Sequence, residues 1–266
     1  MAEQLPMIDL AALDAGGPDA QHVIQAVHAA ASTWGFFLLT GTQVSPRTQS
    51  SLVSISRTFF DLPLDVKTTL DVSSGGVAWR GYMPLGGEHT HGRIDWKEGL
   101  YIGPEHDENH PLVGQPLHGR NQFPDQDLPD MRRIVLEYVE QVTNLGKTLT
   151  DIFSLGLGLG QNHGRYRSRP HRVRRPGPGF PPRFSFPLFF DFAWNAEMVR
   201  LQLDHLVPLS EEEKELAKKR WAATTFREVS GRWSQYLARK VQKVFPDLRL
   251  PILNRTLRLR RDLRGW

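Results

Sequence analysis

The stretch that most constrains the fold of this 266-residue chain runs from Gly164 to Asp191. It holds one histidine, His171, and then an Arg-x-Ser pair, Arg183 and Ser185, in an apolar run rich in aromatic residues. Aromatic residues favour β-strands, so we expect a strand over residues 183–190. Alternate side chains of a strand share a face, which would let the guanidinium and the hydroxyl bind one carboxylate together. With an imidazole nearby, this pattern indicates a pocket for a metal ion and a keto acid.

Several separated motifs resemble those of the iron(II)/2-oxoglutarate-dependent dioxygenases, in the isopenicillin N synthase-like branch. Residues 164–173 read Gly-Arg-Tyr-Arg-Ser-Arg-Pro-His-Arg-Val, and residues 183–186 read Arg-Phe-Ser-Phe. The amino-terminal half carries four further matches: Met7-Ile8-Asp9-Leu10, Trp34-Gly35-Phe36-Phe37, Arg80-Gly81-Tyr82 and Trp96-Lys97-Glu98-Gly99. The resemblance extends to about Leu201, and the order of the motifs makes it specific.

The resemblance implies an α+β protein of the double-stranded β-helix, or jelly-roll, fold. Members of the family bind iron(II) through a His-x-Asp pair and a distal histidine, which leaves positions open for O2 and the keto acid. By resemblance, His171 is the distal metal ligand, and Arg183 and Ser185 bind the far carboxylate of 2-oxoglutarate. The implied reaction oxidises a small organic substrate with O2 and releases succinate and carbon dioxide.

The His-x-Asp pair is missing from this sequence. None of the ten histidines is followed two positions later by aspartate, and His106 alone is followed there by another acid, Glu108. His106 lies in a polar loop bounded by prolines, so we expect it to be solvated and to have no iron role. The chain also passes from residues 155–160 almost directly into Asn162, where the family has much of its barrel. We therefore expect an incomplete barrel flanked by amino- and carboxy-terminal helices, and we assign no catalytic residue.

The expected organisation has four parts. They are an amino-terminal region of helices and strands (1–160), a remnant of the jelly-roll core (161–209), carboxy-terminal helices (210–248) and a basic tail (249–266). In the first part, periodicity and turn residues predict a strand at 7–10, a helix capped by Asp19 and ending near Thr33, a buried strand at 36–39 and a helix starting at Ser45-Pro46. A glycine-rich loop at 72–92, a strand at 95–102, a proline-rich loop at 103–127 and the longest helix, capped by Asp130, are expected to follow.

The amino-acid composition further limits the classes of protein and of binding site that are expected. The chain has no cysteine, which excludes disulfides and thiolate metal sites and fits a cytoplasmic protein. No apolar run is long enough to span a bilayer, and the amino terminus lacks the apolar region of a secretory signal. His89 and His91 have no carboxylate at ligand spacing, so we expect a surface loop there. Six arginines crowd residues 165–175, but without aromatic residues interleaved for base stacking, which makes nucleic-acid binding the weakest hypothesis.

Two interpretations of function stay open. In the first, the chain is an oxygenase acting on a small molecule, impaired because two of three expected iron ligands are absent. In the second, it is a non-catalytic shortened isoform that serves as an interaction module or folds poorly. Loss of central strands would expose unpaired edges and apolar faces, and this would favour self-association.

Overall fold

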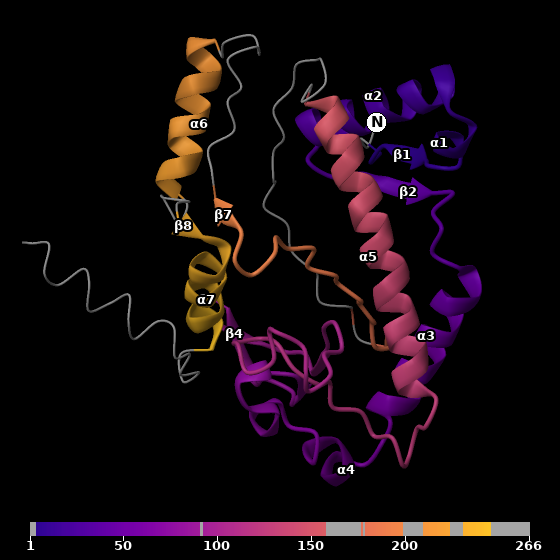
Figure 1. Cartoon of the computed structure of the whole chain (residues 1–266), viewed down its shortest axis with the longest axis vertical. Helices are drawn as coiled ribbons and strands as arrows, with labels where there is room; N and C mark the ends of the chain where they lie inside the picture. Colours follow the sequence, from indigo (N-terminus) through magenta and orange to yellow (C-terminus); the bar gives the residue numbers. More distant parts are fainter. Residues whose placement is uncertain are drawn as a thin grey trace, which may run out of the picture. The chain divides into compact units, whose positions relative to one another are not determined.

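The computed structural model describes residues 4–90, 93–157, 177, 179–198, 210–223 and 231–245 (Figure 1). The chain divides into two compact units, each assembled from separate segments. Unit 1 comprises Met1–Gln49, Glu140–Phe190 and Leu201–Thr224, and unit 2 comprises Ser50–Val139, Asp191–Arg200 and Thr225–Trp266. The arginine-rich residues 165–175 and the basic tail lie outside the described residues, and the four predicted parts stay predictions.

Unit 1 has a core between one helix and a small sheet. Its first elements are β1 (Met7–Asp9), α1 (Ala12–Ala15), α2 (Gly17–Thr33) and β2 (Leu38–Thr40). β1 pairs with β2 in parallel, Ile8 opposite Leu39. The expected apolar face of α2 is confirmed, because Val23, Val27 and Ala30 are buried with Ile8 and Ile152.

Two predictions for this region were wrong in detail. Asp19 is not the cap of α2: Gly16, at φ +67°, occupies the N-cap position. Pro18 then lies at the start of the helix, where its fixed φ is favourable, and Asp19 lies in the first turn. The strand expected at 36–39 begins only at Leu38, and Leu38 is exposed because a two-stranded sheet leaves one face uncovered.

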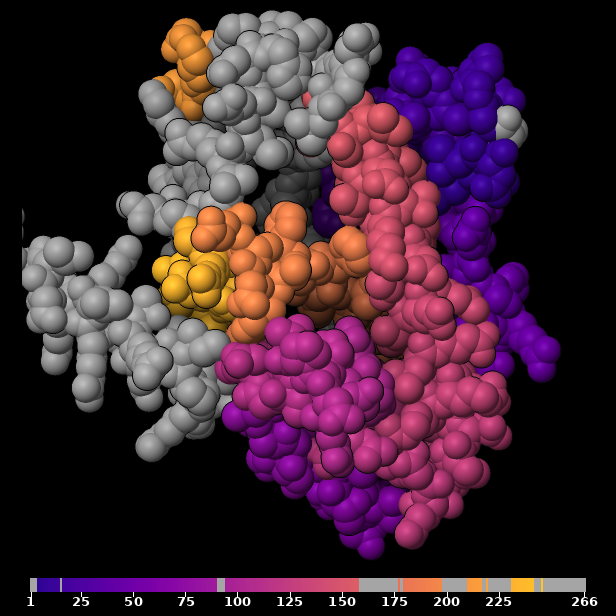
Figure 2. Space-filling view, in the orientation of Figure 1, coloured from indigo at the N-terminus to yellow at the C-terminus, as the bar shows by residue number. Residues whose placement is uncertain are grey.

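Helix α5 (Met131–Gly156) is the longest helix of the described residues and begins directly after Asp130, as predicted. Its apolar residues recur every three or four positions, and this stripe is buried or half-buried in the structure: Ile134, Tyr138, Val142, Leu145, Leu149 and Ile152. Phe153 of this helix also contacts Phe37 edge-on, with ring centroids 6.4 Å apart. Figure 2 shows one side of α5, in pink, uncovered in that view.

Unit 2 collects several short elements around α3 (Pro46–Phe60). They are α4 (Leu64–Thr68), the 3-10 helix η1 (Val72–Ala78), β3 (Gly81–Met83), β4 (Glu88–Thr90), β5 (Arg93–Asp95) and β6 (Gly99–Tyr101). β3 pairs with β6 and β4 with β5, both antiparallel. The fully buried rings of Phe59 and Tyr82 meet edge-on at the centre of the unit.

The glycine-rich loop expected at 72–92 was a wrong prediction, because this segment contains η1, β3 and β4. Gly81 shows why glycine was misleading there. It adopts φ +133°, and a Cβ atom would come within 2.2 Å of the Leu70 carbonyl oxygen. The glycine therefore permits close approach of two backbone segments inside folded structure, rather than marking a flexible connection. The single strand expected at 95–102 is likewise divided between β5 and β6.

The carboxy-terminal segments complete the two units. In unit 1, α6 (Glu211–Ala223) begins with a reciprocal capping box between Ser210 and Glu213. In unit 2, β7 (Glu197–Met198) pairs with β8 (Gly231–Arg232), which leads into α7 (Trp233–Val244). Phe245, at the end of α7, packs its ring against Trp79 and Tyr101, with centroids 5.6 and 6.0 Å apart.

Each sheet within the described residues has two strands. The strand expected at 183–190 is not formed, since a strand requires a neighbour to pair its backbone groups and the described residues supply none beside it. Of the predicted jelly-roll remnant, the described part contains the strand β7 alone. No described helix is both long and apolar enough for a bilayer span.

The packing of α5 predicts a sharp difference between two of its apolar residues. Ile152 is 3% exposed in the core of unit 1, whereas Leu155 is 51% exposed. We expect Ile152→Ala to lower the free energy of unfolding by about 2–5 kcal/mol, through lost burial and the cavity left behind. Leu155→Ala is the matched control and should change it by less than about 0.5 kcal/mol. Denaturant unfolding of the full chain measures both; equal losses would contradict the packing described.

Candidate functional site

Arg183 and Ser185, the residues expected to bind a keto acid, lie in an extended run without strand pairing. Both side chains are exposed, while Phe184 and Phe186 between and after them are half-buried. The predicted alternation of faces is therefore present even though the predicted strand is not. His171, the predicted metal ligand, lies outside the described residues, so its role stays a prediction.

The described residues do not fit a metal centre with three protein ligands. No three histidine, aspartate or glutamate side chains among them are arranged to hold an ion. His89, expected at the surface, is exposed at β4. Its predicted companion His91 lies outside the described residues.

The most fully connected polar site of unit 2 starts at Arg80, between η1 and β3. The Arg80 side chain is buried, and its two terminal nitrogens donate to Asn121 Oδ1 (2.8 Å) and to the Leu117 carbonyl (2.7 Å). Asn121, also buried, accepts from the Gly103 N–H and donates back to the Gly103 carbonyl. Asn121, which the guanidinium binds, thereby joins the two ends of the irregular segment 103–121.

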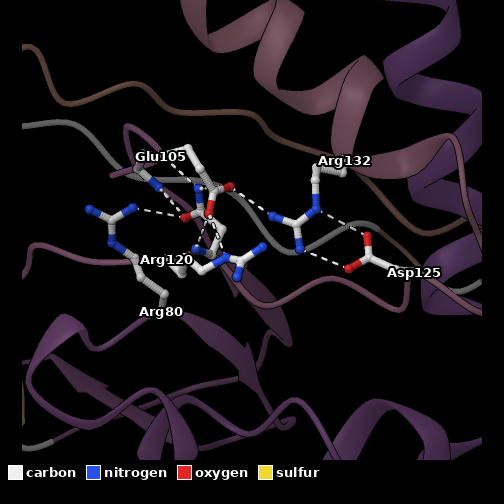
Figure 3. A network of polar contacts seen from close by, with 7 residues as sticks. Arg80, Glu105, Arg120, Asp125 and Arg132 are labelled. Atoms are coloured by element: carbon white, nitrogen blue, oxygen red, sulfur yellow. Dashed lines mark hydrogen bonds and ion pairs between the residues drawn. The ribbon is translucent and has the colours of Figure 1, made fainter. Parts of the chain in front are cut away.

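Glu105 extends this network towards α5, as Figure 3 shows. Its carboxylate accepts from the backbone N–H and the side chain of Asn121, at 3.0 and 3.2 Å. Arg132 donates to Glu105 at 2.8 Å and grips both oxygens of Asp125, at 3.1 and 2.8 Å. A bidentate pair of this kind fixes the orientation of both partners.

The electrostatics are those of a structural network. Burial lowers the pKa of Arg80 to about 10, against the opposing effect of Glu105. The hydrogen bonds from Arg132 lower the pKa of the Asp125 carboxyl, and the same bonds raise the pKa of Arg132. Arg80, Asp125 and Arg132 therefore keep their charges at neutral pH. Since they bind one another, their evident role is to hold the long loop in place rather than to bind a ligand.

Two Tyr–Glu–Lys groups brace the strands beside this network. Tyr82 donates to Glu98 at 2.6 Å, and Lys67 donates to the same carboxylate at 3.0 Å. Tyr101 donates to Glu88 at 2.5 Å, and Lys97 lies 2.7 Å from that carboxylate.

Burial, together with the neighbouring carboxylate, raises the pKa of both tyrosines above the ordinary value, so each keeps its proton and donates. Two residues of the Trp96-Lys97-Glu98-Gly99 motif, Lys97 and Glu98, thus have a structural role: they bind the side chains of the neighbouring strands.

His106 lies in a loop, as predicted, but it is not fully solvated as expected. Its half-buried ring stacks on that of His110, with centroids 3.8 Å apart and planes 13° from parallel. The His106 ring is also nearly parallel to that of His118, with centroids 5.5 Å apart and planes 10° from parallel, and the His118 ring meets Trp194 edge-on. We call the three rings of His106, His110 and His118 the histidine stack. Local sequence concealed it because His118 and Trp194 are distant along the chain.

Sequence reasoning missed three residues that hold this network together: Asn121, Glu105 and Arg132. Arg80 was noted as part of a motif, but its partner Asn121 is 41 residues away. Arg132 and Glu105 are separated by 27 residues. The sequence offered one signal of this network. A long proline-rich segment needs fixed polar contacts to adopt one conformation, and this segment contains charged residues that can make them.

Comparison with known proteins gives a consistent result. Residues 5–126 match the family model described as "non-haem dioxygenase in morphine synthesis N-terminal". A Dictyostelium discoideum protein named a probable iron/ascorbate oxidoreductase is 26% identical over 361 positions, covering 94% of this chain and 97% of that protein. A 2-oxoglutarate-dependent dioxygenase of Trichoderma harzianum is 30% identical over 200 residues, covering 71% of this chain and 61% of the relative.

The extent of these matches is uneven. The chain spans between 44% and 59% of several other curated relatives, about half of their length. Among solved structures, a 2OG-Fe(II) oxygenase family protein from Caulobacter crescentus is similar in fold, with a TM-score of 0.50 at 22% identity. That similarity covers 59% of this chain and 49% of the solved one.

The Arg80 network predicts a specific loss of stability. Arg80→Ala removes the donor to the half-buried Leu117 carbonyl and to the buried Asn121 Oδ1, and loss of hydrogen bonds from a charged group of this kind costs about 1–3 kcal/mol. Arg133→Ala is the matched control, because Arg133 makes an exposed pair with Asp130 and such pairs contribute about 0–1 kcal/mol. Unfolding of the full chain in urea compares the two, and an Arg80 variant as stable as the Arg133 variant would refute the proposed role.

Proposed function

We propose that the chain is a shortened member of the 2OG-Fe(II) oxygenase family whose oxygenase activity is lost or strongly reduced. Oxidation of a small organic molecule by O2 is the nominal activity, with iron(II) and 2-oxoglutarate as the implied cofactors. The proposal concerns what remains of that chemistry in this chain.

The absence of a His-x-Asp sequence carries the proposal. Among the ten histidines none is followed two positions later by aspartate. A facial iron site requires two histidines and one carboxylate, and metal affinity depends on the number and geometry of the ligands. With His171 as the one remaining candidate ligand, we assign no catalytic step to this chain.

The alignment with the Dictyostelium discoideum relative supports an internal gap. It spans 361 positions, whereas 94% of this 266-residue chain is about 250 residues, so about 110 positions hold no residue of this chain. A gap of this size would accommodate the missing ligands and the central barrel strands. We place it after residue 160, where the sequence passes from the end of α5 into the motif around His171.

Binding of the keto acid alone is the part of the family chemistry that Arg183 and Ser185 support. Both are exposed, and the alternation of burial puts them on the same side of the extended run. The guanidinium and the hydroxyl both donate hydrogen bonds, so together they can bind a carboxylate. Without chelation of the keto group by a metal, we expect the binding to be weak.

Exposed aromatic residues favour a second candidate, a non-catalytic interaction module. In unit 1, Phe180 is 74% and Phe189 82% exposed, within a short stretch that also exposes Leu188. Exposed apolar side chains gathered in this way are typical of surfaces that associate. Self-association is therefore the alternative role, and the cysteine-free composition fits a cytoplasmic site for either function.

The enzymatic test measures succinate formation by the purified full chain with iron(II), ascorbate and 2-oxoglutarate. We expect no turnover above that of His171→Ala, because a lone imidazole does not create a facial iron site. Iron retained after desalting should likewise be the same for both proteins.

Succinate formation that depends on iron and disappears in His171→Ala would overturn the proposal. Binding of 2-oxoglutarate by calorimetry is a separate measurement: Arg183→Lys keeps the charge but loses the planar fork, so any binding through Arg183 should weaken. Size-exclusion chromatography of the same preparations reports on the alternative role.

A further inference from the structure

The histidine stack joins two segments of unit 2 that are far apart in sequence. His106, His110 and His118 belong to the irregular segment 103–121, and Trp194 belongs to the segment before β7. The Trp194 side chain is buried, and its ring centroid lies 5.0 Å from that of His118. The rings thus form a continuous aromatic column across the two segments.

The segment that carries Trp194 is in turn fixed to the start of α7. The Trp194 carbonyl accepts from the Ser234 N–H at 3.2 Å, and the Ala196 carbonyl accepts from the Trp233 N–H at 2.8 Å. A change in the stack would therefore be transmitted to the β7–β8 pair and the first turn of α7.

The hydrogen bonds of the stack depend on the protonation state of its rings. Nδ1 of His110 accepts the Leu112 N–H at 3.2 Å, which requires a lone pair on that nitrogen. Nδ1 of His118 lies 2.8 Å from the Pro116 carbonyl and donates to it. Protonation of His110 at Nδ1 replaces an acceptor by a donor, so the bond to Leu112 is lost.

The charges around the stack oppose a further positive charge. Buried Arg80 donates to the carbonyl of Leu117, the residue directly before His118. Burial lowers the pKa of His106, and the other two imidazoles and Arg80 lower it further, while Asp107 opposes them. Burial also lowers the pKa of His118, with Arg80 and His110 adding to the effect and the bond to Pro116 opposing it.

We propose that the histidine stack is a proton-operated latch, which holds segment 103–121 against Trp194 when the rings are neutral and releases both segments when they are protonated. Neutral imidazoles stack without repulsion, whereas two imidazolium rings at 3.8 Å beside Arg80 would repel one another. Release would expose Trp194 and loosen the β7–β8 pair.

The direction of the pH dependence follows from linkage. His106 and His118 have a lowered pKa in the folded protein, so the unfolded state binds protons more readily. The stabilisation by the stack is complete above the ordinary histidine pKa of 6.5 and is lost as the pH falls below it. Acid should therefore open the latch, and alkaline pH should leave it closed.

The test is hydrogen exchange of the full chain, followed by mass spectrometry at pH 7.5 and pH 5.5 after correction for intrinsic rates. Peptides covering 104–119 and 190–198 should lose protection at the lower pH, by roughly tenfold for each unit of pKa depression. In His106→Phe the ring still stacks but does not titrate, so less protection should be lost at pH 5.5 than in wild type. His22→Phe is the matched control, exposed on α2 outside the stack, and should behave as wild type.

Wild-type protection that is the same at both pH values would overturn the proposal. So would an equal loss of protection at pH 5.5 in wild type and in His106→Phe. If His106→Phe fails to fold at pH 7.5, His118→Phe takes its place. It removes the other ring with a lowered pKa and can still meet Trp194, so it too should lose less protection than wild type at pH 5.5. A loss confined to residues outside the two named segments would also count against the latch.

Discussion

The guanidinium of Arg80 is the group on which unit 2 depends. It is buried, it keeps its charge, and it binds two points of a segment that has no helix or strand of its own. Because Asn121 then closes on Gly103 and Glu105, one side chain fixes the path of nearly twenty residues. Replacing the polar contacts by apolar packing would not give the same result, since a long loop has many alternative ways of collapsing and directional bonds select among them.

Sequence reasoning succeeded where neighbours in sequence are also neighbours in space. The stripe on α5 and the buried face of α2 were predicted because a helix repeats its environment every three or four residues. Gly81 and His106 show the opposite case. From the sequence, Gly81 looks like a loop residue, because its close approach to Leu70 is not evident. His106 looks fully solvated, because its contact with His118, twelve residues later, is not evident either. For the same reason Arg183 and Ser185 were correctly predicted to share one face, whereas the strand predicted for them is not formed.

The motifs by which this chain resembles the dioxygenases serve two different purposes. Arg80-Gly81-Tyr82 and Lys97-Glu98 supply the contacts that hold unit 2 together, and they need no metal to do so. The resemblance alone predicts that His171, Arg183 and Ser185 are the cofactor-binding positions. A chain can therefore keep the first set of motifs, and with it a recognisable fold, after the ligand set has been broken. Resemblance in the amino-terminal half is evidence of ancestry and packing, and the ligand positions must be judged one by one.

The packing of Phe245 on Trp79 and Tyr101 has a consequence for biosynthesis. Chains emerge from the ribosome amino terminus first, at about 5–20 residues per second, and a domain cannot close before its last segment is made. Phe245 therefore covers the aromatic rings of residues 79 and 101 only after residue 245 has been translated. Until then the nascent chain lacks this aromatic contact, and chaperones that bind exposed aromatic segments can bind there.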